Sequence, residues 1–201
     1  EGDEIRVVDG TGNAYDVRLV TINKKLAHGV VQNMYRHHNE PDTSVTLAVG
    51  LLKNPSKFDF LVEKVTELGV KKIIPLKTER AIPNHAKTDR WQKLALSAMK
   101  QSGRSFLPHV QEMTTLESVL KEHVSCEQKI IAHEKEIQLG SQRNVFEGAH
   151  SSILICIGPE GGFSDEEVDV CLKAGFIPVY LGERRLRTET AAIVVSALAI
   201  R

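Results

Sequence analysis

The 201-residue chain has few aromatic residues, three cysteines and no long apolar run, and each of these scarcities excludes a class of protein. Its longest nearly unbroken apolar stretch, residues 191–200, is about half of the roughly 20 residues that a membrane-spanning helix needs. No basic segment followed by an apolar one stands at the start of the given sequence, so we expect no secretory leader. Cys126, Cys156 and Cys171 are odd in number and widely separated, which favours neither a disulfide framework nor a CxxC metal site. We therefore expect a cytoplasmic protein with no membrane span and no metal.

The net charge is zero, but the charges are distributed unevenly along the chain. Residues 53–104 contain 12 basic and 5 acidic residues, whereas the segments before and after them are both net acidic. A basic segment of this kind can supply a phosphate-facing surface on a neutral protein. A set of solvated helix faces explains the same charges, and at this point both readings stay open.

The first 40 or so residues have the pattern of β-structure. Residues 5–8 and 15–19 are short branched or aromatic runs, and the turn-rich segment 9–13 joins them, which predicts a hairpin. A hairpin is too small to bury a core of its own, so it packs on the rest of the chain or belongs to a domain that begins upstream. Residues 37–44, which contain Pro41, are the predicted linker.

From Val45 onward, strand-like and helix-like segments alternate, which predicts a mainly parallel sheet with helices on both faces. The predicted strands lie at 45–49, 73–76, around 110, 130–131, 153–157 and 179–181. The predicted helices have N-caps at Ser56, Thr88, Ser164 and Thr188, and a further one lies near 116–120. The last helix is apolar on nearly every side, so we expect it to be buried in the core or against a partner subunit.

The segment I-G-P-E-G-G-F-S, residues 157–164, lies between a predicted buried strand and a predicted helix. Gly161 and Gly162 allow the backbone to approach a ligand closely, and free N–H groups in such a turn can bind polar ligand atoms. The segment matches neither a phosphate-binding Walker loop, nor a dinucleotide fingerprint, nor a hydrolase nucleophile elbow. Taken alone, it is equally consistent with a tight connection between strand and helix.

A second glycine loop, L-G-E-R-R-L-R-T-E-T-A at residues 181–191, also follows a predicted strand and precedes a helix. Ligands of open α/β sheets bind beyond the carboxyl ends of the strands, so the two loops would form one pocket if their strands are neighbours. Arg184, Arg185 and Arg187 would stand at its rim and could bind phosphate. Surface ion pairs with Glu183 or Glu189 are the alternative.

Four ordered motifs give the chain a resemblance to a known family. They are K-V-T-E-L-G-V at 64–70, Q-S-G-R at 101–104, I-G-P-E-G-G-F-S-D-E-E at 157–167 and L-G-E-R-R-L-R-T-E-T-A-A at 181–192. With them, residues 45–201 strongly resemble the RsmE family of bacterial 16S rRNA methyltransferases, which belongs to the SPOUT superfamily. The resemblance implies methylation of uridine N3 by S-adenosylmethionine, with 16S rRNA or the small ribosomal subunit as substrate.

The resemblance also implies an architecture. It predicts an α/β SPOUT methyltransferase domain at 43–201 with a C-terminal trefoil knot, and it predicts that the protein is a homodimer. Residues 1–42 would be the later strands of a PUA-like β-barrel, here incomplete. A module that keeps this fold and binds RNA or assists ribosome assembly without catalysis is the alternative.

The chemistry of that reaction suggests roles for particular residues. Uridine N3 must lose its proton on or before transfer, which calls for a general base or for a cation near the developing anion. We expect Arg187 to be that cation and Glu189 to be the base or an orienting group. The residues expected to hold the cofactor are His133, Gly158, Glu160, Gly161, Gly162, Leu181, Gly182, Leu186, Thr190 and Ala191.

Other polar residues have less definite predicted roles. The strand end at Ala132, His133 and Glu134 can close the same pocket, although a lone histidine is more often structural. The candidates for contact with the RNA backbone are Arg80, Lys87, Arg90, Lys93 and Arg104. Trp91, at an apolar helical position, is expected in the core rather than as a platform for stacking bases.

Overall fold

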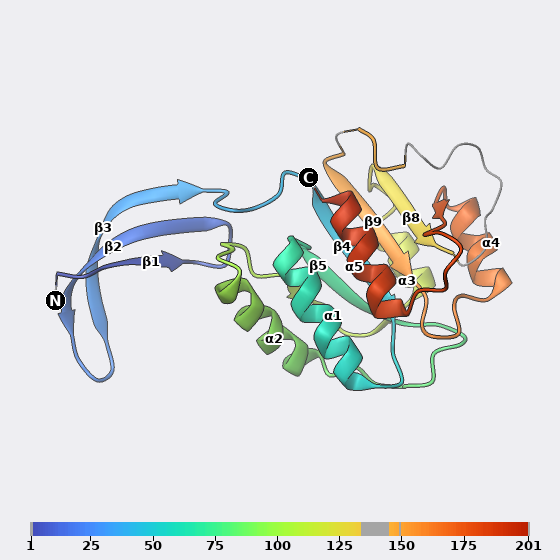
Figure 1. The fold of residues 1–201 in the computed structure, drawn as a ribbon, viewed down its shortest axis with the longest axis horizontal. Coiled ribbons are helices and arrows are strands. Elements are labelled where there is room, and N and C mark those ends of the chain that lie inside the picture. Colours follow the sequence, from blue (N-terminus) through green and yellow to red (C-terminus); the bar gives the residue numbers. More distant parts are fainter. Residues whose placement is uncertain (1, 134–144, 149, 201) are drawn as a thin grey trace.

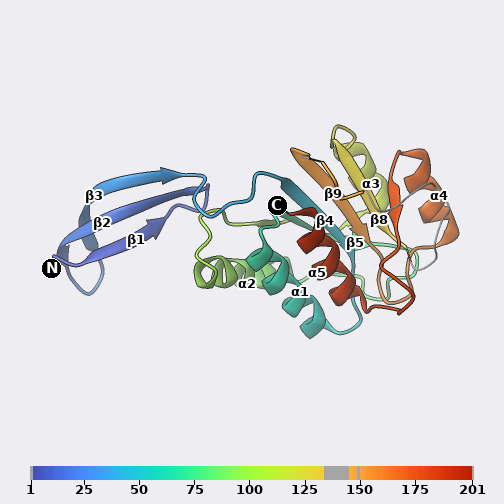
Figure 2. The same cartoon turned by 45° about the horizontal axis from the view of Figure 1, so that its top comes forward.

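The computed structural model describes residues 2–133, 145–148 and 150–200. Figure 1 shows that the sheet at the N-terminal end extends away from an α/β body formed by the rest of the chain. The view in Figure 2, turned by 45°, shows the same separation. The two parts are joined by residues 37–43, so the predicted linker is confirmed to within a residue.

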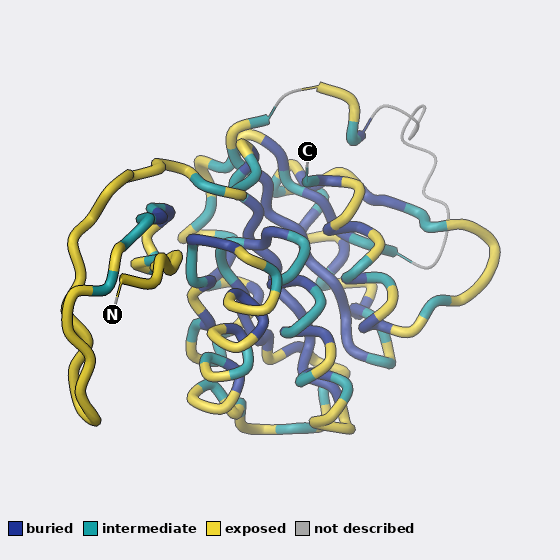
Figure 3. Tube along the Cα trace, turned by 60° about the vertical axis from the view of Figure 1, so that its left-hand side comes forward, coloured by how far each residue is buried: buried dark blue, intermediate teal, exposed yellow. Residues whose placement is uncertain are grey.

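The N-terminal sheet is antiparallel and consists of β1 (Glu4–Val8), β2 (Asn13–Ile22) and β3 (Ala27–Arg36). It confirms the predicted hairpin. Asp9 stabilises the turn between β1 and β2, because its carboxylate accepts hydrogen bonds from Thr11 and Asn13. These bonds, led by the one from the Asn13 side chain, hold the pKa of Asp9 well below its usual range. Every residue of β3 is exposed, so this sheet has almost no core of its own (Figure 3).

The body contains a seven-stranded sheet in the described part of the chain, with the order β10-β8-β9-β4-β5-β6 and β7 beside the end of β5. Its strands are β4 (Ser44–Gly50), β5 (Lys72–Lys77), β6 (His109–Val110), β7 (Thr114–Thr115), β8 (Gln128–Ala132), β9 (Ser152–Ile157) and β10 (Ile177–Val179). All of the pairings are parallel, as predicted from the alternation. The predicted last strand was placed too late, because β10 ends at Val179 and Leu181 belongs to the following loop.

Helices cover both faces of this sheet, and side chains alternate between two cores. One face is covered by α1 (Pro55–Leu68), α2 (Thr88–Gln101) and α5 (Thr188–Ala199), and the other by α3 (Leu116–Glu122) and α4 (Asp165–Lys173). In β9, Ile155 packs toward α1 and α5, while its neighbours Leu154 and Cys156 pack toward α3 and α4. Trp91 is buried and stacks on Phe58, with ring centroids 4.0 Å apart, so its predicted core position is confirmed.

The helix starts were predicted with mixed success. Ser164 is the N-cap of α4 and forms the expected capping box with Glu167. The other three predicted caps were wrong: α1 begins at Pro55 after the cap Asn54, and Thr88 and Thr188 are the first helical residues of α2 and α5. A serine or threonine near a helix start therefore indicated the helix but not which residue caps it, since proline also favours the first helical position.

The C-terminal helix α5 is buried on one side only. Ala192, Val195 and Ala199 pack into the core, whereas Val194 and Leu198 remain exposed, at 36% and 46%. Its nearly continuous apolar composition thus serves the core on one face and leaves an apolar surface on the other.

Candidate functional site

A pocket of about 350 Å³ lies beyond the carboxyl ends of β8, β9 and β10. This volume falls within the roughly 300–1,000 Å³ that small-molecule sites occupy. Its wall is formed by residues 157–160, 162–163, 180–188 and 191, together with Ala132 and His133 at the end of β8 and Lys57 from α1. The two glycine loops therefore meet over one pocket. Their strands are not direct neighbours, because β8 lies between β9 and β10.

The loop after β9 is built from closely approaching backbone. A Cβ atom on Gly158 would lie 2.8 Å from the carbonyl carbon of Gly162 and 2.9 Å from the nitrogen of Phe163. Gly162 has a φ of +71° and its N–H donates to the Pro159 carbonyl at 2.8 Å, which closes the turn. Gly50, at the end of β4, faces the same turn, and a Cβ there would lie 2.5 Å from the Pro159 nitrogen. At Gly158 and Gly50 the backbone segments therefore approach too closely to leave room for a side chain.

Two neighbouring loops hold this turn in place. The Glu160 carboxylate accepts a hydrogen bond from the Lys53 N–H at 3.0 Å, in the connection between β4 and α1. From the connection after β5, Arg80 donates to the Gly161 carbonyl at 3.0 Å, and the Glu79 N–H donates to the Glu167 carboxylate at 2.9 Å. Arg80, expected on the RNA backbone, thus also supports the glycine loop.

Among the charged side chains of the pocket wall, basic ones outnumber acidic ones. Lys57, Arg184, Arg185 and Arg187 line it, against the two carboxylates Glu160 and Glu183. Such a surplus favours negatively charged groups of a ligand or substrate.

Lys57 connects the pocket to a buried carboxylate. Its Nζ lies 3.5 Å from Oε1 of Glu189, whose side chain is 9% exposed. Glu189 Oε2 is buried, and the described part of the protein offers it no hydrogen-bond partner. Lys57 was missed by sequence reasoning, although it belongs to the basic segment and lies in the first turn of the helix that follows β4, near the strand ends where ligands of α/β sheets bind.

Most of the residues predicted to hold the cofactor line the pocket. Those on its wall are His133, Gly158, Glu160, Gly162, Leu181, Gly182, Leu186 and Ala191, joined by Arg187. Gly161, Thr190 and Glu189 lie beside the wall rather than on it, in the described structure. Glu134 lies outside the described residues.

Three of the five predicted RNA contacts, Lys87, Arg90 and Lys93, lie on α2 or at its N-cap. Lys87 and Lys93 are exposed on and beside α2, and exposed Arg90 pairs with Asp59 at 2.8 Å. Asp59 also accepts a hydrogen bond from the Trp91 indole, at 3.0 Å.

The prediction for Arg104 was wrong. Its side chain is 3% exposed and pairs at 2.6 Å with Glu40, so it cannot contact RNA. Sequence could not show this, because the partner stands 64 positions away in the chain.

The described residues provide neither a membrane-spanning helix nor a metal-binding cluster. No helix there is both long and apolar enough to cross a membrane. Within residues 2–133, 145–148 and 150–200, no group of three or more His, Cys, Asp or Glu side chains is placed to hold a metal ion.

Comparisons with known proteins agree with this geometry. The model of a family described as RNA methyltransferase domain matches residues 39–200. The chain is 34% identical to ribosomal RNA small subunit methyltransferase E of Synechocystis sp., over 98% of this chain and 65% of that protein. It is 32% identical to the protein of the same name in Mesomycoplasma hyopneumoniae, over 93% of this chain and 81% of that protein.

A solved structure is similar as well. The crystal structure of a ribosomal RNA small subunit methyltransferase E from Neisseria gonorrhoeae, bound to S-adenosyl methionine, superposes with a TM-score of 0.85 at 33% identity. The similarity covers 98% of this chain and 81% of that one.

Proposed function

The chain belongs to the RNA methyltransferase domain family, with ribosomal RNA small subunit methyltransferases E as relatives, and we propose that it methylates 16S rRNA with S-adenosylmethionine. The observation that carries the proposal is the convergence of the two glycine loops on one pocket. No observation favours the alternative of a non-catalytic module.

The residues of the pocket fit this cofactor. Backbone segments approach closely at Gly158, and on the other loop Gly182 bends the backbone with a φ of +99°, a conformation that favours glycine. Main-chain N–H and carbonyl groups on such turns can hold the polar edges of a nucleoside. We propose that the eight wall residues named above contact the cofactor, and that Gly161 and Thr190, which lie beside the wall, position the loops that carry them.

S-adenosylmethionine supplies a methyl group already activated by its sulfonium sulfur. The chain then has to align donor and acceptor and to manage the N3 proton of the uridine, which we propose as the target base. Arg187, on the pocket wall before the first turn of α5, is proposed as the cation that stabilises the developing uridine anion.

Glu189 is proposed as an orienting group rather than the base. Its carboxylate lies beside the wall and faces Lys57, whose ammonium reaches the pocket. A buried carboxylate at this distance attracts the lysine ammonium and helps to orient it. Lys57 would then contribute a second fixed positive charge to the site.

The finer architecture belongs to the same proposal. We propose a domain at 43–201 with a C-terminal trefoil knot. The path of the chain after β10 supports the knot. From β10, which lies beside β8 at the edge of the sheet, the chain returns along the pocket to α5. Helix α5 packs beside α1, on the face of the sheet opposite α4.

We also propose a PUA-like segment at 1–42, a homodimer and a cytoplasmic location. The exposed apolar residues Val30 and Val31 of β3 suit an incomplete barrel, and Val194 and Leu198 of α5 suit a subunit contact.

Two measurements test the function. Calorimetry with S-adenosylmethionine should give micromolar binding, and no binding at millimolar cofactor would refute the enzymatic role. Small-subunit rRNA from a strain lacking the gene should lack one N3-methyluridine, which the purified protein should restore. Intact N3-methyluridine in that strain would refute the substrate assignment while leaving cofactor binding untouched.

A further inference from the structure

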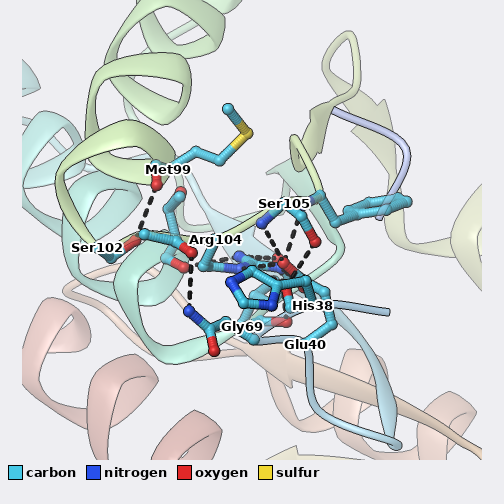
Figure 4. Close-up of polar contacts among 12 residues, drawn as sticks. His38, Glu40, Gly69, Met99, Ser102, Arg104 and Ser105 are labelled. Carbon is cyan, nitrogen blue, oxygen red and sulfur yellow. Dashed lines mark hydrogen bonds and ion pairs between the residues drawn. The ribbon is translucent and has the colours of Figure 1, made fainter. Parts of the chain in front are cut away.

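Two of the four motifs, at 64–70 and 101–104, lie outside the pocket wall but meet each other in space. They meet at the side chain of Arg104, at the end of α2, which reaches across to the end of α1 (Figure 4). The proposed methyl transfer gives neither motif a role.

The buried guanidinium of Arg104 has hydrogen-bond partners on each of its three nitrogens. Its guanidinium donates to the carbonyls of Thr66 at 2.7 Å, Val70 at 3.1 Å and Gly69 at 3.3 Å. These carbonyls belong to the C-terminal end of α1, where helices leave acceptors without partners. The same guanidinium pairs with Glu40 at 2.6 Å. A planar, forked donor suits such a site, whereas the point charge of lysine does not.

Glu40 belongs to the linker between the N-terminal sheet and the body. Its side chain is 1% exposed, and its other oxygen accepts hydrogen bonds from the N–H groups of Ser105 and Phe106, both at 2.9 Å. Pro41 follows it and packs against Gly69, where a Cβ would lie 2.8 Å from the proline ring. The linker is therefore clamped onto the ends of α1 and α2.

The residues around Arg104 also hold the sheet itself. The Ser105 hydroxyl donates to the His38 carbonyl at 2.6 Å, and the Asn39 amide donates to the Gly103 carbonyl at 3.1 Å. The turn between β1 and β2 joins through Gly12, whose N–H donates to the Ser105 carbonyl at 3.1 Å, and Gly10, whose carbonyl accepts from Leu107 at 2.9 Å. Segment 103–107 thus binds two separate parts of the N-terminal piece.

We propose that the Arg104–Glu40 pair is a latch that sets the orientation of the N-terminal sheet relative to the pocket, and thereby presents the RNA to the methyl donor. This inference rests on the proposed function. The connecting element is α1, which carries Lys57 at its pocket end and Gly69 at its latch end. A helix of 14 residues spans about 20 Å, so the latch acts by positioning and not by touching the reacting groups.

The test uses the full chain and the variants Arg104→Lys and Glu40→Gln. Both should bind S-adenosylmethionine within about twofold of the unchanged protein, because the pocket is remote. Both should raise KM for small-subunit RNA by about tenfold or more with kcat nearly unchanged, because the sheet is held less firmly once the pair is lost. Small-angle scattering should show a broader distribution of sheet orientations. Glu67→Gln is the matched control, since it removes a half-buried ion pair from the same helix, with Lys64 at 2.7 Å.

Several results would overturn the proposal. A loss of cofactor affinity with unchanged KM would mean that the pair supports the pocket, and a folded variant with unchanged KM and scattering would mean that it has no positioning role. If Arg104→Lys does not fold, Glu40→Gln carries the test, because its amide oxygen can still accept from Ser105 and Phe106. If the unchanged protein does not methylate small-subunit RNA, the proposed function fails, and the scattering of the variants still decides whether the latch holds the sheet.

Discussion

Replacing Gly158 by alanine tests how the pocket wall is built. Gly158 has no positive φ, so alanine brings no backbone strain of its own and only the added methyl group matters. That methyl would lie 2.8 Å from the carbonyl carbon and 3.0 Å from the Cα of Gly162. Carbon atoms in contact prefer about 3.5–4.0 Å, so the turn must open by about 1 Å.

The expected size follows from this displacement. Overpacking of a close contact costs about 1–3 kcal/mol. If the cofactor binds only to the closed turn, this cost is subtracted from the free energy of binding. The dissociation constant for S-adenosylmethionine then rises about 5- to 150-fold, at about 1.4 kcal/mol per factor of ten. Opening the turn would also lengthen the hydrogen bond from Gly162 to Pro159, now 2.8 Å.

Calorimetry with S-adenosylmethionine and thermal unfolding measure the two effects side by side. Gly175→Ala is the control: Gly175 follows α4, has a φ of +83° and has no atom within 4 Å of an added Cβ. That variant should lose about 1–2 kcal/mol of stability from the left-handed backbone and keep its cofactor affinity. A Gly158→Ala protein that binds the cofactor as tightly as the unchanged chain would refute the close-packed backbone wall.

Three further outcomes are expected. Arg187→Ala should lower single-turnover methyl transfer by about 100-fold while cofactor affinity changes little; equal losses in both would assign Arg187 to cofactor binding instead. Burial raises the pKa of Cys171 to about 12 and raises that of half-buried Cys126 less, so the reactive thiolate of Cys171 is scarce at pH 8 and increases only as the pH rises. Iodoacetamide followed by mass spectrometry should label Cys126 first, and equal rates would contradict the packing of α4. Ser164→Ala should cost about 1 kcal/mol in denaturant unfolding through loss of the capping box, with Ser164→Thr largely restoring it; an unchanged midpoint for the alanine variant would contradict the cap.

Local patterns were sufficient for much of the fold. Alternation of strands and helices after Val45 predicted a parallel sheet with two covered faces, and the apolar spacing around Trp91 predicted its core position. The sequence of 164–167 predicted a capping box that the structure contains. Each of these features depends on residues within a few positions of one another. At that range the geometry of the chain allows few conformations for a given pattern of residues.

Other features depended on which distant segments meet. The insertion of β8 between β9 and β10 was not visible in the sequence, and neither was the placement of Lys57 beside Glu189. Arg104 shows the difference most clearly: in the sequence it was one basic residue in a basic segment, and in the structure Glu40 and three carbonyls enclose it.

By itself, then, the sequence determined which elements form and which two loops carry glycines able to make tight turns, because backbone freedom and periodicity are local properties. Only the tertiary structure decided which cations reach the pocket and which are buried as structural partners. The reason is physical: a charged side chain becomes a surface contact, a pocket wall or a buried pair according to the desolvation and the partners it meets, and these come from segments far away in the chain.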